Sequence, residues 1–501
     1  MIDPAIFIGI DIGSSSTKAV AVTHDGCIVG QAQKLNVITN PQPGFAEMDV
    51  EKYWWGSTLS AIKLLLENPK VKTKSIKGIG LCSIGASFSL VDQKNEVLRP
   101  GILYGIDSRA SEQIAELNQT FGEDALIQKT GRTLTSQSVG PKIMWVKHHE
   151  PSIWKRADRV LTPVALLSGR LCGVEAIDPH TALTFDPFFD PKKIAWDSDM
   201  VTQLIGQKSK LPEIRWPGES LGLLTDSAAR LTGLPAGIAV ACGTADVTAE
   251  AIGSGVRKAG DLLLMYGSTL FMLQRVDQFI PRPSLWPSFL LDNSQPTVLA
   301  GTSNAGSVLD WVLREIHSEG NALTAFESAS KVPPGCEGLI CLPYFAGERS
   351  PIFDPYASGI FLGLRMHHTR AHMLRAVMEG IGYSFLNLLD NFGANGVFPK
   401  KIFASGGGTN NKIWTQIMSD ISGVDQQITR VSQGAAIGAA YLGGMAAGVF
   451  KRNQSMPQTW LNGHTEIKVS ATAHKKYREQ YPFFLEAYQK NKILMHQLIQ
   501  K

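Results

Sequence analysis

The chain has 501 residues, which is too many for one ordinary hydrophobic core, so two domains or two halves facing a cleft are expected. Its 48 basic and 44 acidic residues leave a formal charge of +4 without a concentrated basic stripe, so nucleic acid is not expected as a partner. The six cysteines form no CxxC pair, a usage typical of thiols kept reduced in a cytoplasm.

The N-terminal stretch "MIDPAIFIGID" has no basic region ahead of its short apolar run, so it predicts a strand and not a signal peptide. The most apolar later segment, residues 434–450, is dominated by glycine and alanine, which favours a helix packed inside protein over a membrane span. We therefore expect a cytoplasmic protein without a membrane partner.

The chain opens with strands at residues 6–13, 18–23 and 27–33, the last two joined by an Asp-Gly turn. The first strand ends with Asp11 and Gly13, and four consecutive hydroxyl residues, Ser14 to Thr17, connect it to the second. Such a turn can cradle phosphate oxygens with backbone N–H groups and hydroxyls, and its glycine permits close approach. Asp11 has two interpretations: a turn-capping carboxylate, or a ligand of a Mg2+ ion that separates it from phosphate.

Helical and strand-like patterns alternate after this opening. Residues 53–69 and 108–122 are helical, and residues 76–92 are strand-like with a glycine-rich end. Further helices are expected at residues 372–392 and 474–500. This alternation predicts an α/β layered architecture.

Residues 240–255, "VACGTADVTAEAIGSG", place Asp246 where a strand passes into a helix. A carboxylate there has two possible tasks. It can cap the helix by accepting its free N–H groups, or it can face a cleft and accept the proton of a substrate hydroxyl during phosphoryl transfer.

A second strand-turn-strand unit follows at residues 260–276, with Gly267, Ser268 and Thr269 in its turn. The similarity to the first unit indicates either a duplication with one phosphate-facing turn in each half or two ordinary hairpins.

Two later loops are also unusual. Residues 401–423 contain Gly406-Gly407-Gly408 and then polar residues before a helix, so a flat ring or a ribose could lie on the bare backbone. The loop "AGERSPIFDP" brings Glu348, Arg349 and Asp354 together, either as an exposed ion pair or as the lining of a cleft.

In their order, these stretches resemble the FGGY carbohydrate kinase family, within the superfamily of actin, hexokinase and Hsp70. "GIDIGSSSTKAV" and "MYGSTLFML" resemble its two phosphate motifs, "GTADVTAEAIG" the segment of the catalytic aspartate, "LPYFAGERSPIFDPYASGIFLGL" the family signature, and "ASGGGTNNKIWTQIMSDISG" the adenosine motif. The resemblance implies two ribonuclease H-like (actin-like ATPase) α/β domains facing a central cleft, with an N-terminal domain at 1–250 and a C-terminal domain at 251–501.

The resemblance further implies transfer of the ATP γ-phosphate to a hydroxyl of a small sugar, with Mg2+ and with a ketopentose such as xylulose or ribulose as the first candidate. Asp246 would accept the hydroxyl proton, and Asp11 and Asp246 would hold the metal. The implied nucleotide contacts are Gly13, Ser14, Ser15, Ser16 and Thr17, then Gly267, Ser268 and Thr269, and, around adenosine, Gly407, Gly408 and Asn411. The implied sugar contacts are Gly85, Ala86, Asp107 and Arg109, together with Asp246.

The acceptor itself stays open, because "CSIGASFSLVD" lacks the Met-His pair typical of xylulokinases and the Arg-Glu pair typical of glycerol kinases. Glycerol, a sugar acid, erythrulose or a signalling dihydroxy-ketone are the alternative substrates. A nucleotide-dependent assembly protein like actin or Hsp70 is the alternative from another class, although such proteins lack the "FAGERSPIFDP" loop. A homodimer is a further expectation.

Overall fold

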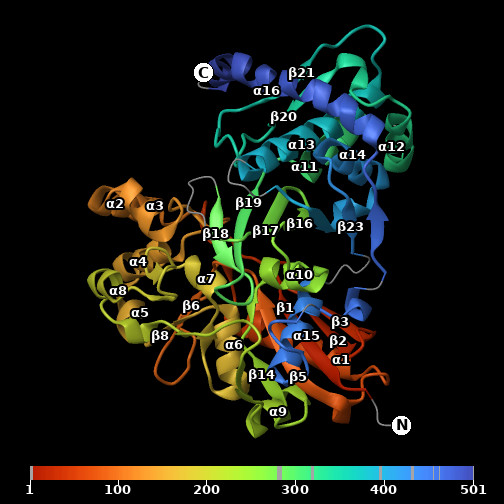
Figure 1. Ribbon diagram of the computed structural model, residues 1–501. Coiled ribbons are helices and arrows are strands. Elements are labelled where there is room, and N and C mark those ends of the chain that lie inside the picture. Colours follow the sequence, from red (N-terminus) through yellow and green to blue (C-terminus); the bar gives the residue numbers. More distant parts are fainter. Residues whose placement is uncertain are drawn as a thin grey trace. The chain divides into compact units, whose positions relative to one another are not determined.

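The computed structural model describes residues 4–278, 285–317, 321–393, 398–429, 434–454, 456–461 and 463–499 (Figure 1). The chain forms two compact units, each built from three segments. Unit 1 comprises Met1–Arg257, Asp277–Thr297 and Gln433–Asn462, and unit 2 comprises Lys258–Val276, Val298–Ser432 and Gly463–Lys501. The first segment of unit 1 ends at Arg257, seven residues after the boundary expected at residue 250. Unit 1 also includes two segments from later in the chain, Asp277–Thr297 and Gln433–Asn462.

The central sheet of unit 1 has the strand order β13-β14-β5-β1-β2-β3. Strands β1, β2 and β3 form the antiparallel meander that the sequence predicts, whereas β5 runs parallel to β1 and β14 runs parallel to β5. A short strand, β15, pairs with the end of β5. The bounds are β1 Ile6–Ile12, β2 Ser16–Thr23, β3 Ile28–Leu35, β5 Ile76–Ser83, β13 Ser220–Leu223, β14 Ala239–Ala241 and β15 Thr244–Ala245.

The two faces of this sheet are built differently, because side chains alternate along a strand. Ile8, Ile10 and Ile12 of β1 belong to one large core with residues of α1 and β5. The opposite face of β1 carries Gly9, and a Cβ there would lie 1.9 Å from the carbonyl oxygen of Ala436 in α15. In Figure 1 the blue helix α15 lies among the red and orange strands of unit 1. The glycines therefore let a helix from late in the sequence lie directly on the sheet backbone.

The remaining helices of unit 1 follow the alternating pattern of the sequence. They are α1 Ser57–Leu66, α2 Ser111–Phe121, α3 Glu123–Thr130, α4 Val139–His149, α5 Pro151–Arg156, α6 Pro163–Cys172, α7 Pro179–Leu183, α8 Ser198–Ile205, α9 Asp226–Thr232, α10 Asp246–Ser254 and α15 Gly434–Ala446. Short strands accompany them: β4 Glu47–Met48, β6 Ser89–Val91, β7 Gly101–Ile102, β8 Arg159–Leu161, β9 Ala176–Ile177, β10 Phe189–Asp190, β11 Ala195–Trp196, β12 Glu213–Ile214 and β18 Trp286–Phe289.

Unit 2 has its own sheet, which includes the order β19-β17-β16-β22-β23-β24. Strands β16 and β17 are antiparallel, and β22 runs parallel to β16. The bounds are β16 Asp261–Tyr266, β17 Leu270–Arg275, β19 Pro296–Gly301, β20 Ile340–Pro343, β21 Gly359–Leu362, β22 Lys401–Ser405, β23 Gln426–Ile428 and β24 Thr465–Ile467. The helices are α11 Gly306–Glu315, α12 Ala322–Ser330, α13 Arg370–Gly393, α14 Lys412–Ser422 and α16 Ala471–Ile499.

The predicted α/β architecture with a sheet in each of two units is confirmed, and so are the two long helices expected near residues 372–392 and 474–500. Within the described ranges, none of the helices combines the length and the apolarity that crossing a bilayer needs.

Candidate active site

The register of three parallel strands in unit 1 brings Asp11 and Asp246 to one edge of the sheet. Asp11 of β1 pairs with Cys82 of β5, and Thr244 of β15 pairs with the same Cys82. Asp246 follows β15 directly as the first residue of α10. Parallel strands present their carboxyl ends on the same side, so two carboxylates far apart in sequence become neighbours.

The environment of this pair disfavours two negative charges. Burial raises the pKa of Asp11 to about 6; Lys18, its partner in β2, opposes the shift, and Glu250 adds to it. Burial also raises the pKa of Asp246 to about 7, and the neighbouring charge of Asp11 raises it further. A hard divalent cation would relieve this repulsion, and carboxylate oxygens are ligands that Mg2+ prefers. The donor set therefore fits a magnesium ion.

The structure tests one of the two tasks considered for Asp246 at the helix start, that of a helix cap. The N-cap position of α10 is occupied by Ala245, and Asp246 lies in the first turn, where its Oδ1 accepts the N–H of Val247 at 2.8 Å. Its side chain is half-buried. The carboxylate is therefore not the cap of this helix.

The turn between β1 and β2 is tight, because a hydrogen bond between its own backbone groups closes it. The N–H of Gly13 donates to the carbonyl of Ser16 at 3.0 Å, and a Cβ at Gly13 would lie 2.8 Å from that oxygen. Ser15 is exposed and Ser14 is half-buried, whereas Ser16 and Thr17 are buried. Two of the four hydroxyl residues are thus open to a ligand.

Asn36, which sequence reasoning missed, clamps this turn. Its Nδ2 donates to the carbonyl of Gly13 at 2.8 Å and to the hydroxyl of Thr17 at 3.1 Å, and its N–H donates to the carbonyl of Ser15 at 2.9 Å. Asn36 is 8 % exposed. A lone asparagine just after a strand carries no local signal for this contact, which only the meander creates.

Gly85 and Ala86 follow β5 beside the same carboxylates. The N–H of Ile84 donates to the carbonyl of Ile12 at 3.0 Å, and a Cβ at Gly85 would touch the Cβ of Ala245 at 3.4 Å. Ala86 has a φ of +51°, a backbone conformation that few residues other than glycine adopt. The structure therefore brings this segment and Asp246 together.

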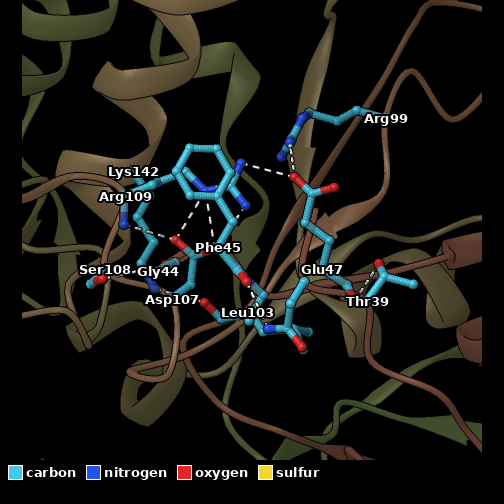
Figure 2. A network of polar contacts seen from close by, with 12 residues as sticks. Thr39, Gly44, Phe45, Glu47, Arg99, Leu103, Asp107, Ser108, Arg109 and Lys142 are labelled. Atoms are coloured by element: carbon cyan, nitrogen blue, oxygen red, sulfur yellow. Dashed lines mark hydrogen bonds and ion pairs between the residues drawn. The ribbon is translucent and has the colours of Figure 1, made fainter. Parts of the chain in front are cut away.

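Asp107 and Arg109 form a buried ion pair with each other (Figure 2). Nε of Arg109 donates to Oδ1 of Asp107 at 2.9 Å and Nη2 donates to Oδ2 at 2.7 Å, while the N–H of Ala46 also donates to Oδ2, at 2.7 Å. Asp107 is 0 % exposed. This carboxylate is therefore fully occupied by its own chain.

The network around Arg109 extends further. Its guanidinium lies 4.1 Å from the ring centroid of Phe45 and 4.9 Å from that of Trp145, and its Nη1 lies 2.9 Å from Oε1 of Glu47. Nζ of the nearby Lys142 donates to the carbonyls of Leu103 and Tyr104 at 2.6 and 2.8 Å, and burial lowers its pKa to about 7. Asp107 and Arg109 therefore stabilise the loop that follows β7 through their mutual ion pair and their bonds to Ala46 and Glu47.

In unit 2, the turn of Gly267, Ser268 and Thr269 rests on the start of α11. The N–H of Gly306 donates to the carbonyl of Gly267 at 3.0 Å, and the N–H and hydroxyl of Ser307 donate to the carbonyl of Ser268 at 3.1 and 2.9 Å. Gly267 and Ser268 are exposed. The outward side of this turn is thus free for a ligand.

The glycine-rich loop after β22 lies at the same sheet edge as this turn, since Met265 of β16 pairs with Ser405 of β22. Gly406 has a φ of +93°, and a Cβ there would lie 2.5 Å from the carbonyl oxygen of Tyr266. A Cβ at Gly408 would lie 2.6 Å from the Trp414 ring, while at Gly407 it would meet nothing within 4 Å. The loop therefore exposes bare backbone at Gly407.

Asn411 caps the helix that follows this loop. Its Oδ1 accepts the N–H groups of Ile413 and Trp414 at 3.1 Å each. The residue type and its place before a helical pattern were the available signal for a cap.

A cleft of about 640 Å3 also lies in unit 2, beside α11 and α12. Asp310, Leu313 and Arg314 of α11 line it, together with residues of α12 and the start of α13. Sequence reasoning did not single out these residues. Because α11 begins at the Gly267-Ser268 turn, the helix connects this turn to the cleft.

The loop with Glu348, Arg349 and Asp354 is not an exposed ion pair. Glu348 is 4 % and Asp354 is 3 % exposed, and burial raises the pKa of Glu348 to about 7. This corrects the first of the two interpretations of the loop, since its carboxylates are enclosed by protein.

Comparisons with known proteins match both halves of the chain to one family. Residues 6–253 match the N-terminal domain of the FGGY family of carbohydrate kinases, and residues 264–447 match its C-terminal domain. The chain is 31% identical over 448 residues to the xylulose kinase of Escherichia coli K12, covering 88% of this chain and 90% of that protein. It is 28% identical over 487 residues to the xylulose kinase of Staphylococcus xylosus, covering 97% and 100%.

The crystal structure of xylulose kinase from Rhodospirillum rubrum superimposes with a TM-score of 0.88 at 28% identity, over 98% of this chain and 100% of that one. The predicted resemblance and the predicted actin-like ATPase fold are thereby confirmed. The chain belongs to the FGGY family of carbohydrate kinases.

Proposed function

We propose that this ATP-dependent carbohydrate kinase phosphorylates a ketopentose, with xylulose as the first candidate. The observation that carries the chemistry is the alignment of Asp11 and Asp246 at one sheet edge, directly beside the Gly13–Thr17 turn. The choice of sugar is supported by relatives that carry the name xylulose kinase over nearly the whole chain.

Asp246 would act as the general base toward the attacking sugar hydroxyl. A pKa of about 7 leaves a substantial share of the carboxylate ionised at neutral pH while keeping its affinity for a proton high. Accepting the hydroxyl proton as the oxygen attacks the γ-phosphorus is the task such a group can perform. Asp11 and Asp246 would hold Mg2+, which supplies charge neutralisation for the phosphates when bound.

The two turns would bind the phosphates of ATP. In unit 1, the backbone N–H groups and the hydroxyls of Ser14 and Ser15 are the candidate donors, since the N–H of Gly13 already donates to Ser16, and Ser16 and Thr17 are buried. In unit 2, the exposed side of Gly267, Ser268 and Thr269 would contribute. Positioning and charge neutralisation suit a dissociative transition state, which needs little covalent chemistry from protein.

Adenosine would lie against the open backbone of Gly407 and next to Gly408, and Asn411 would contribute by fixing the start of α14. The cleft beside α11 is a second candidate for the base. With a rise of about 1.5 Å per residue, Asp310 and Arg314 lie about 6 and 12 Å along the helix from its start at the phosphate turn, a span that suits a nucleotide.

The sugar would lie between Asp246 and the small residues Gly85 and Ala86. Asp107 and Arg109 would shape this pocket by fixing the loop that follows β7. Because Gly85 and Ala86 carry little side chain, other short ketoses and polyols are the alternative acceptors. A cytoplasmic location and a homodimeric state remain predictions.

The experiment is a coupled ADP-release assay with Mg-ATP across ketopentoses, erythrulose, glycerol and sugar acids. We expect the highest kcat/KM with a ketopentose, and a loss of kcat of about 10^3-fold in Asp246→Asn. Asp226→Asn is the matched control, because Asp226 is likewise the first residue of a helix but is exposed. The proposal fails if no acceptor is phosphorylated or if Asp246→Asn keeps full activity.

A further inference from the structure

The loop of residues 346–355 carries two buried carboxylates that contact different parts of unit 2. Glu348 and Asp354 pair through their backbones, each N–H donating to the other's carbonyl at 2.9 Å. Their side chains are enclosed to a similar degree, at 4 % and 3 % exposure. The loop therefore offers two similar groups whose partners differ.

The carboxylate of Glu348 holds the segment of residues 302–307, which we call the bridging segment. Its Oε1 accepts the N–H of Ser303 at 2.5 Å and the N–H of Arg349 at 2.8 Å. Nη2 of Arg349 donates to the carbonyl of Thr302 at 2.5 Å.

Asn304 fastens the bridging segment to the same loop. Its Nδ2 donates to the carbonyl of Gly347 at 2.5 Å, and its Oδ1 accepts the N–H of Ala346 at 3.0 Å. Three consecutive residues of the bridging segment, 302 to 304, are therefore bound to the loop that carries Glu348.

The other side of the bridging segment holds the turn of Gly267, Ser268 and Thr269. The N–H of Thr302 donates to the carbonyl of Leu270 at 3.0 Å, and its hydroxyl accepts the N–H of Leu270 at 3.2 Å. The N–H groups of Ala305 and Gly306 donate to the carbonyls of Ser268 and Gly267 at 3.1 and 3.0 Å. A Cβ at Gly306 would lie 2.6 Å from the carbonyl oxygen of Gly267, so the two backbones are too close for any side chain at this position.

We propose that Glu348 is a positioning residue for the phosphates of ATP, because it fixes the Gly267–Thr269 turn through the bridging segment. This inference rests on the proposed function, in which that turn contacts the phosphates. Burial raises the pKa of Glu348 to about 7, which shows that enclosing this carboxyl costs free energy. Because the Glu348 carboxyl is costly to bury and its hydrogen bonds fix the bridging segment, we assign it the role of positioning that segment.

Asp354 provides the matched control within the same loop. Its carboxylate accepts the hydroxyl of Tyr488 at 2.7 Å and contacts Nε2 of His496 at 2.7 and 2.9 Å. These partners belong to α16, not to the bridging segment. Removing the Asp354 carboxylate should therefore weaken the attachment of α16 without moving the phosphate turn.

The test compares ADP with adenosine, two ligands that differ only in the phosphates, by calorimetric titration of the full-length protein. In Glu348→Ala we expect the affinity for ADP to fall about tenfold, as loss of fixed hydrogen bonds predicts, and the affinity for adenosine to change less than about twofold. Glu348→Gln keeps an acceptor oxygen and should stay within about threefold of wild type for ADP. Asp354→Ala should lower Tm and leave the ratio of the two affinities unchanged.

The kinetic counterpart is a rise in KM for ATP in Glu348→Ala with an unchanged KM for the sugar. A folded Glu348→Ala protein with wild-type affinity for ADP, or with equal losses for ADP and adenosine, overturns the inference. If this variant does not fold, Arg349→Met removes the bond to the Thr302 carbonyl and the attraction between its guanidinium and Glu348, and an unchanged KM for ATP there contradicts the positioning of the turn by this loop. A wild-type protein that phosphorylates no acceptor overturns the proposed function instead, so the two failures are distinguishable.

Discussion

Removing the charge of Asp246 should stabilise the ligand-free protein at alkaline pH, although the same change should lower kcat about 10^3-fold. In the folded chain the pKa of this carboxyl is about 7, against 3.8 as the ordinary value. Between these two pH values the unfolded chain releases a proton that the folded chain keeps. The stability that the protonated Asp246 carboxyl contributes is therefore fully present below about pH 4 and is lost as pH rises toward 7. Asp246→Asn cannot undergo this loss.

The size of the effect follows from the shift. A change from 3.8 to about 7 corresponds to about 4 kcal/mol as an upper limit. The side chain of Asp246 is half-buried, so solvent screens part of the repulsion, and we expect a gain of about 1 to 3 kcal/mol at pH 8. At pH 4 the two proteins should be equally stable, because the carboxyl is then protonated in the folded state.

The assay is urea unfolding of wild type and Asp246→Asn at pH 4, 6 and 8 in the presence of a chelator, followed by a far-UV signal. The difference in the free energy of unfolding should grow with pH, and added Mg2+ should stabilise wild type more than the variant. A variant less stable than wild type at pH 8, or a difference that does not depend on pH, would refute the reasoning about the carboxylate pair.

Three further changes test other parts of the structure. Asn36→Ala removes both side-chain bonds to the first turn and should raise KM for ATP about tenfold without changing KM for the sugar; steady-state kinetics that show equal rises would contradict this role. Gly438→Ala places a Cβ 1.9 Å from the Ala249 carbonyl oxygen and should cost about 3 kcal/mol in urea unfolding. The control Gly393→Ala, whose Cβ would have its nearest atom at 3.5 Å, should cost less than about 1 kcal/mol. Asp107→Asn leaves the buried Arg109 without its anionic partner at this position and should lower stability by about 3 kcal/mol. It should also raise KM for the sugar, and an unchanged thermal melt would argue against the buried network.

The candidate site residues were chosen from local signals. A strand that ends in glycine and hydroxyl residues, as at Gly13–Thr17, fits a phosphate turn or an ordinary hairpin, and the order of several such stretches identified the family. The predicted meander of β1, β2 and β3 also followed from apolar runs separated by short turns. Each stretch is recognised from residues within about ten positions of one another, and only the order of the stretches spans the chain.

The remaining features depend on contacts between distant residues. The Ala46 N–H reaches Asp107 because β4 pairs with β7, and no spacing in the sequence reveals that pairing. The clamp by Asn36 is likewise a product of the meander. Asn411 is a different case, since an asparagine directly before a helical pattern is a local signal for a cap.

The helix α15 has a consequence for how this protein can be made and dissected. Its backbone covers Gly9 of β1 and Gly80 of β5, although more than three hundred residues separate it from either strand. During translation the first sheet must wait, with one face bare, until residues 434–446 leave the ribosome. A truncated protein that stops at residue 257 would keep that face of the sheet exposed to water, so we expect it to be much less stable than the full chain.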